Sequence, residues 1–140
     1  MSRLLLLPAL FAASSSIAEI NPDRAQFHYR MHCQGCHMPD GSGASDVPQM
    51  KGQIGKFLRT QEGREYLVRV PGSALSALED DELAELLNWI LREMGETSLP
   101  DSYNRYTSAE VGKFRQRPLN EVEAHREKLV TDIEHLTESP

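Results

Sequence analysis

The residues best placed to do chemistry are two cysteines and a histidine in the run Cys-Gln-Gly-Cys-His at positions 33–37. Two thiols three positions apart can each form a thioether bond to one of the two vinyl groups of a haem. The adjacent His37 then lies beneath the iron and can supply an imidazole ligand. The chain has no other cysteine. The run therefore predicts covalent attachment of one haem c through Cys33 and Cys36, with His37 as the proximal iron ligand.

Two other interpretations of the cysteine pair stay open. A redox-active dithiol expects its Cys-x-x-Cys pair beside a βαβ pattern, and little strand pattern flanks residues 33–37. A structural zinc site needs four protein ligands. The nearest further candidates for that role are His28 and His32, and both fit better as helix residues. Covalent haem is therefore the favoured interpretation.

The first 18 residues resemble a secretory signal peptide. Arg3 precedes an apolar stretch over residues 4–13, and the small residues Ser16 and Ala18 predict cleavage after Ala18. A membrane anchor is the alternative, but a span takes about 20 apolar residues and this stretch is shorter. We therefore expect an exported, periplasmic bacterial protein that does not span the membrane after cleavage. Since haem would use both thiols, no disulfide is expected.

The chain without this peptide is acidic. The 140 residues hold 15 Lys and Arg against 21 Asp and Glu. Removal of Arg3 leaves 14 basic residues and a formal charge of −7. Such a surface argues against binding to nucleic acid or to anionic lipid. It favours a partner with a basic docking patch, although acidity can also serve solubility alone.

The pattern around the cysteines is helical. Asn21-Pro22-Asp23 is typical of a helix start, and the helix that it opens runs into Cys33. A turn-rich loop over 39–43 and an extended segment over 47–52 follow. Short helices are expected at 54–59 and 62–68, with a break at Pro71-Gly72.

The clearest helix is 79–94, where leucine, isoleucine and methionine recur at the helical spacing and Gly95 provides a stop. Residues 96–140 form a helical extension. Thr107 and Glu110 make a capping box that opens a short helix, and a second helix is expected over 121–136. His125 and His135 on that helix are expected to be solvated.

At this point the chain resembles the class I, single-haem c-type cytochromes over about residues 21–94. In that family a small residue and an aromatic residue let the first helix cross the last one closely. Ala25 and Tyr29 occupy those positions here, with Leu86 and Trp89 as their counterparts. The resemblance implies an all-α, cytochrome c-like domain over 19–95 wrapped around one covalent haem, followed by the extension.

The resemblance also assigns residues on the proximal side of the haem. Relatives have a Pro-x-apolar-x-Gly run, which Pro48, Met50 and Gly52 match. In relatives the proline carbonyl accepts a hydrogen bond from the proximal imidazole, so the resemblance makes Pro48 the partner of His37. Arg69 is our choice for a propionate partner among the basic residues of the middle segment.

The distal side departs from the family. Most relatives supply a methionine just ahead of the last helix, but residues 70–75 read Val-Pro-Gly-Ser-Ala-Leu. Met50 is the remaining methionine candidate, although the family match makes it proximal core, and Tyr66 is a further possibility. Met31, Met38 and Met94 are expected to pack as apolar residues. An iron that is five-coordinate or bound by water is also possible.

Three functions follow from this pattern. The first is a single-electron carrier, not an enzyme, with a periplasmic dehydrogenase or oxidase as its redox partner. The second is a haem-based binder or sensor of small ligands with an open distal site. The third is a haem subunit of a larger periplasmic redox enzyme, which the extension would help to dock. A peroxidase is disfavoured, since no distal histidine acid–base pair is evident.

Overall fold

The described part of the chain is helical. The computed structural model describes residues 20–138, so the predicted signal peptide and its cleavage site after Ala18 lie outside the described residues. Between residues 20 and 138 there is no strand, only an isolated bridge that joins Ala44 to Val47. The predicted all-α fold is confirmed.

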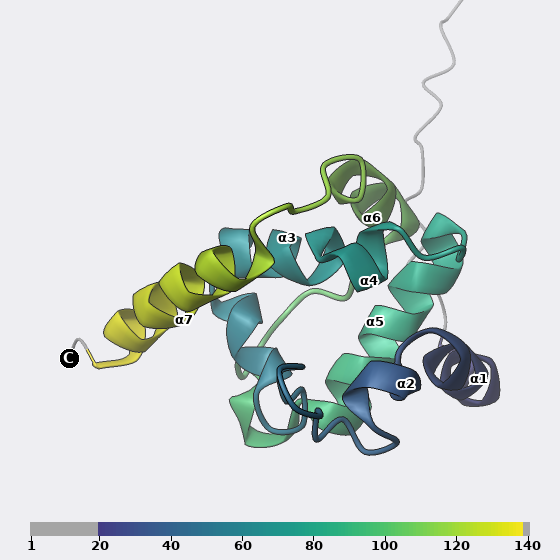
Figure 1. Cartoon of the computed structure of the whole chain (residues 1–140), viewed down its shortest axis with the longest axis horizontal. Coiled ribbons are helices and arrows are strands. Elements are labelled where there is room, and N and C mark those ends of the chain that lie inside the picture. The colour runs from purple at the N-terminus through teal and green to yellow at the C-terminus, as the bar shows by residue number, and fades with distance from the viewer. Residues whose placement is uncertain (1–19, 139–140) are drawn as a thin grey trace, which may run out of the picture.

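The elements follow one another in the order drawn in Figure 1. The α-helices are α1 (Pro22–His32), α2 (Gln34–His37), α3 (Gln61–Arg69), α4 (Pro71–Ala74), α5 (Asp80–Met94), α6 (Ser108–Phe114) and α7 (Val122–Glu138), and two 3-10 helices are η1 (Ile54–Arg59) and η2 (Glu96–Ser98). None of the described helices has the length and apolar character needed to cross a bilayer.

Helices α1 and α5 pack against each other through the residues that the resemblance indicates. Ala25, Tyr29, Leu86 and Trp89 are all buried. The Tyr29 and Trp89 rings lie 5.6 Å apart between centroids and are tilted by 46°, within the range of favourable aromatic pairs. Because Ala25 carries only a methyl group, the two helices can approach closely at this point.

A buried carboxylate ties the start of α1 to the middle of α5. Glu85 accepts hydrogen bonds from the Asn21 backbone N–H at 2.6 Å and from the Arg24 guanidinium at 2.7 Å and 2.9 Å. Burial would raise the pKa of the Glu85 carboxyl, but these bonds outweigh it and hold the pKa below its usual value. No local sequence pattern marks this residue, because its partners are some sixty positions away.

The ends of the helices follow their capping residues. Helix α5 begins after Glu79, which forms a capping box with Glu82, and it ends at Gly95. Helix α3 ends at Arg69, as the expected break at Pro71 requires, but Pro71 then begins the short helix α4. Proline suits that first position because its missing N–H has no helical partner there.

Residues beyond Gly95 pack onto the rest of the chain. Tyr106 is fully buried, its backbone N–H and C=O both bind the Asn88 side chain of α5, and its hydroxyl donates to the Arg64 carbonyl at 2.7 Å. Arg64 in turn binds Glu110 at 2.6 Å. The Glu110 side chain is thus directed to Arg64, while Thr107 caps α6 by accepting from the Glu110 backbone N–H.

Helix α7 lies beside α3 and η1, at the edge of the molecule in Figure 1. Leu129 and Ile133 are buried on its inner face. The expectation that His125 is solvated is wrong, since its ring stacks on Tyr66 with centroids 5.9 Å apart and planes 6° from parallel. His125 precedes Leu129 by four residues and so shares the same face of the helix.

Replacement of Asn88 by alanine tests the attachment of the C-terminal segment. Asn88→Ala would leave two buried backbone groups of Tyr106 without partners, and each costs about 1–3 kcal/mol. We expect the free energy of unfolding, measured in denaturant, to fall by about 2–4 kcal/mol. Asn104→Ala, at an exposed position, is the matched control. Equal stability of the two variants would show that the paired bonds to Tyr106 contribute nothing.

Candidate haem site

The cysteine motif forms a single helical turn at the end of α1. Cys33 ends α1, and its carbonyl accepts from the backbone N–H groups of Cys36 and His37 at 3.2 Å and 3.0 Å. Both cysteines are free thiols, with Cys33 half-buried and Cys36 exposed. The turn therefore presents two unpaired sulfurs next to the histidine, as attachment to a haem requires.

The His37 ring is held by the loop that follows it. Its Nδ1 lies 3.2 Å from the carbonyl oxygen of Pro48. A carbonyl only accepts, so this contact places the proton on Nδ1 and leaves the Nε2 lone pair for a metal. The contact is the one that the resemblance implies between these two residues.

Burial shifts the pKa values of the His37 imidazole and the Cys33 thiol. It lowers the pKa of the His37 imidazole, against the opposing effect of the bond to Pro48, so the ring is neutral near pH 7. Burial also raises the pKa of the Cys33 thiol to about 11, with a smaller contribution from nearby Cys36. Redox-active Cys-x-x-Cys pairs depend on a lowered thiol pKa, so this shift argues against the dithiol interpretation.

The histidines considered for zinc are directed elsewhere. His28 is buried against α5, where its Nε2 lies 4.0 Å from the Glu82 carboxylate. His32 packs edge-on against His28, with ring centroids 6.3 Å apart. Both rings belong to the helical part of α1, which agrees with the expectation that they are helix residues.

The loop over 38–52 is shaped to carry the Pro48 carbonyl. The Tyr29 hydroxyl donates to the Met38 carbonyl at 2.6 Å, and the Gly43 N–H donates to the His37 carbonyl at 3.1 Å. Gly43 has a φ of +76°, and a Cβ there would collide with the backbone of Val47 and Pro48. Glycine is therefore required at this position for the loop to fold back beside His37.

Met50 lies in this same loop. Its backbone N–H donates to the Gly41 carbonyl at 2.8 Å, and its side chain packs partly buried against the core. Because Met50 is two residues from Pro48, it belongs to the side of the site that holds the proximal histidine. The structure therefore gives its role as a distal ligand no support, and that role stays a prediction.

The other methionines are divided between core and surface. Met94 is buried, with its sulfur beside Gly41, whereas Met31 is 64% exposed on α1. Met38 has a φ of 64° at the end of α2 and is half-buried. The expectation of apolar packing fits Met94 best and does not fit Met31.

Residues 70–75 are the segment in which the family resemblance predicts the distal side of the site. They include the short helix α4, and Leu75 at its end is 70% exposed. The Arg115 guanidinium, from the C-terminal segment, donates to the carbonyls of Ala74, Ser76 and Leu78 and to the Asp80 carboxylate. Arg115 thus holds the end of this segment at Ala74 and the residues that follow it up to Asp80.

Tyr66, the other distal candidate, is buried in a stack of rings. Its ring lies 5.1 Å from that of Phe57 and 5.9 Å from that of His125, between centroids. Burial raises the pKa of its hydroxyl, while the charge of Arg126 acts in the opposite direction. A neutral phenol is a poor iron ligand, so this environment does not favour Tyr66 in that role.

Arg69, our choice for a propionate partner, is engaged by the C-terminal segment. Its Nε donates to the Arg117 carbonyl at 2.7 Å, and its Nη1 lies 4.0 Å from the Glu65 carboxylate. The Leu119 N–H in turn donates to the Arg69 carbonyl at 2.9 Å. Its role toward a propionate stays a prediction, and the contacts seen here account for the residue without it.

Comparison with known proteins decides the family. No protein-family model matches the chain, and no solved structure is significantly similar to it. The chain is 30% identical over 118 aligned residues to cytochrome c-552 of Thermus thermophilus, a match that covers 69% of this chain and 90% of that protein. A second cytochrome c-552 of the same species is also 30% identical and is covered over 80% of its length. The chain belongs to the class I c-type cytochromes.

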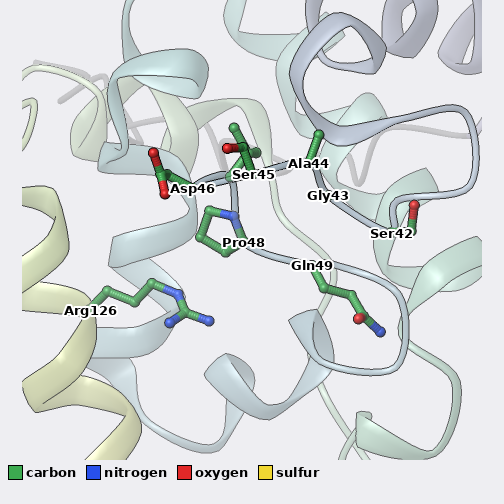
Figure 2. Close-up of a pocket in the computed structure, with 9 residues that line it drawn as sticks. Ser42, Gly43, Ala44, Ser45, Asp46, Pro48, Gln49 and Arg126 are labelled. Atoms are coloured by element: carbon green, nitrogen blue, oxygen red, sulfur yellow. The ribbon is translucent and has the colours of Figure 1, made fainter.

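The residues of this cytochrome fit the prosthetic group of its family. Cys33 and Cys36 offer two thiols on one turn, and His37 offers a neutral ring whose second nitrogen is already bonded. Residues 42–49, which include Pro48, line a cavity of about 420 Å³ together with Arg126 (Figure 2). No local sequence pattern marks Arg126, because the cavity forms only when α7 packs against the rest of the chain.

A substitution at Gly43 tests how the cytochrome holds His37. Gly43→Ala would displace the backbone that carries the Pro48 carbonyl, and a positive φ costs alanine about 1–2 kcal/mol. A weaker bond makes the imidazole a less basic ligand. We therefore expect lower stability and a raised midpoint potential, measured by denaturant unfolding and by potentiometric titration of the haem-loaded protein. Ser45→Ala is the control, because Ser45 is exposed in the same loop and a residue with a Cβ already has a φ of 52° there. Identical behaviour of the two variants would contradict the assigned role of the loop.

Proposed function

We propose that this cytochrome binds one haem c through thioether bonds to Cys33 and Cys36, with His37 as the proximal iron ligand, and carries single electrons in the bacterial periplasm. The observation that carries the proposal is the His37 ring, whose Nδ1 is held by Pro48 beside two free thiols. Membership of the c-type cytochromes supports an electron-transfer function.

Each residue has a distinct task in this proposal. When bound, the haem supplies an iron that cycles between the ferric and ferrous states. Cys33 and Cys36 keep the group in a small domain, and His37 is held in one tautomer and orientation by Pro48. That bond raises the basicity of the ligand and so stabilises the ferric state. Ligand basicity and burial are thus the means by which the chain sets the potential.

The redox partner is proposed from charge. With a formal charge of −7 after loss of the signal peptide, the surface is suited to a periplasmic dehydrogenase or oxidase that presents basic residues. Such charge complementarity mainly increases the rate at which the two proteins associate, and this increase becomes smaller as ionic strength rises. Export follows from the proposed signal peptide over residues 1–18.

A second candidate function rests on residues 70–75. This segment holds no methionine, histidine or lysine. An iron with His37 as its single protein ligand would bind small molecules such as carbon monoxide, so a ligand binder or sensor is the alternative. A docking role for the C-terminal segment in a larger enzyme is less well supported, because Leu129 and Ile133 of that segment are buried against this same chain.

The visible spectrum of the exported holoprotein separates these functions. An electron carrier should show a reduced low-spin spectrum that carbon monoxide does not change, and a reversible one-electron midpoint in potentiometric titration. A high-spin spectrum that shifts with the gas would instead establish the ligand binder. His37→Ala serves as the control and should lose the normal c-type spectrum. An unchanged spectrum in that variant would refute the assignment of His37.

A further inference from the structure

The helix crossing uses the ring of Tyr29 but not its hydroxyl group. The ring is 1% exposed and packs against Trp89, a contact that a phenylalanine ring would make equally well. The hydroxyl instead donates to the Met38 carbonyl at 2.6 Å, nine positions along the chain. Burial raises the pKa of Tyr29 to about 12, so near neutral pH the hydroxyl keeps the proton that it donates. The hydroxyl thus has a role separate from the crossing, and its acceptor indicates which.

The acceptor, Met38, has a strained backbone. Its φ is 64° and its ψ is 163°, a combination that is essentially reserved for glycine. Pro39 follows it, and a residue before proline ordinarily combines such a ψ with a negative φ. Because the Cβ of methionine raises the free energy of this conformation, surrounding contacts must hold the residue in place.

Within residues 20–138, three hydrogen bonds hold the backbone of Met38. Its N–H donates to the Gln34 carbonyl at 3.0 Å, and its carbonyl accepts from the Gly41 N–H at 3.3 Å and from the Tyr29 hydroxyl at 2.6 Å. The first two partners are within four positions of Met38 and belong to the same stretch of chain. Tyr29 is the partner that joins Met38 to the buried crossing of α1 and α5, and its bond is the shortest of the three.

The conformation of Met38 decides whether the loop can reach His37. Met38 directly follows His37, and the loop that starts there returns until the Pro48 carbonyl lies 3.2 Å from the His37 Nδ1. A negative φ at Met38 would send the chain in another direction, because φ and ψ are the only soft dihedral angles of each residue. The Tyr29 hydroxyl therefore stabilises, from a distance, the bond that orients the imidazole.

We propose that Tyr29 is a positioning residue for His37: its hydroxyl holds Met38 in the strained conformation and so fixes the orientation of the proximal imidazole. This inference rests on the proposed function, since it takes His37 as the iron ligand. Tyr29 acts through Met38 and the 38–52 loop. One side chain thereby links the crossing of α1 and α5 to the redox potential.

The test compares Tyr29→Phe with Tyr106→Phe in the full-length, haem-loaded protein. Both tyrosines are buried and each donates its hydroxyl to a backbone carbonyl, that of Tyr106 to Arg64 at 2.7 Å. Loss of either bond should reduce the folding equilibrium constant about five- to tenfold, measured by unfolding in denaturant. The two variants are matched in the bond that they lose, and only the Tyr29 bond belongs to the loop that holds His37.

Tyr29→Phe should be the variant that changes the haem. When Met38 relaxes, the bond from His37 to Pro48 weakens and the imidazole becomes a less basic ligand. We expect a raised midpoint potential in potentiometric titration. We also expect an altered pattern of hyperfine-shifted haem methyl signals in the ferric protein, because this pattern follows the orientation of the proximal ring. Tyr106→Phe should keep the parent values in both measurements, and parent values for Tyr29→Phe would overturn the proposal.

A second arm tests whether the hydroxyl acts through Met38. Glycine adopts a positive φ without the cost that a Cβ brings, so Met38→Gly removes the need for the restraint. Addition of Tyr29→Phe to Met38→Gly should therefore shift the potential and the methyl signals much less than Tyr29→Phe does in the parent protein. Shifts of the same size in both backgrounds would overturn the proposal.

Failure of this inference can be told apart from failure of the proposed function. Haem content of each variant is measured after denaturation, which reports covalent attachment alone, and the potential is read only from loaded molecules. Absence of haem from the parent protein would overturn the proposed function and this inference together. Full haem content in the parent, with Tyr29→Phe equal to Tyr106→Phe in both haem measurements, would overturn the inference alone.

Discussion

The rest of this structure depends on the crossing of α1 and α5. The crossing fixes the direction in which α1 ends, and the two thiols and His37 follow directly from that end. Burial of Tyr29 and Trp89 in the contact stabilises it by about 2 kcal/mol for each side chain. Ala25 leaves the space for their approach, and Glu85 binds the first turn of α1 from α5.

A second set of contacts holds the 38–52 loop, which follows the cysteine motif and contacts His37. The Tyr29 hydroxyl binds the Met38 carbonyl, so one residue serves both the helix crossing and the loop. Gly43 lets that loop return to His37, and Pro48 then fixes the imidazole. Residues from the C-terminal segment complete the arrangement, with Arg115 binding the 74–80 segment and Arg126 facing the cavity.

Local patterns in the sequence predict the features whose residues are close together in the chain. Helix α5 and the start of α1 follow from apolar spacing and capping, and the contact of His37 with Pro48 follows from a family pattern. The buried roles of Glu85 and Asn88 could not be predicted, because their partners are distant in the chain. The same holds for His125 and Arg126, whose surroundings form only when α7 packs against α3.

The proposed function requires that a haem be bound covalently to this chain at Cys33 and Cys36. The most direct test is the intact mass of the exported protein after acidic organic extraction, which removes haem that is not covalently bound. We expect the mass of the processed chain plus one haem, and loss of that increment when both cysteines are changed to serine. A wild-type mass equal to that of the bare chain would contradict it.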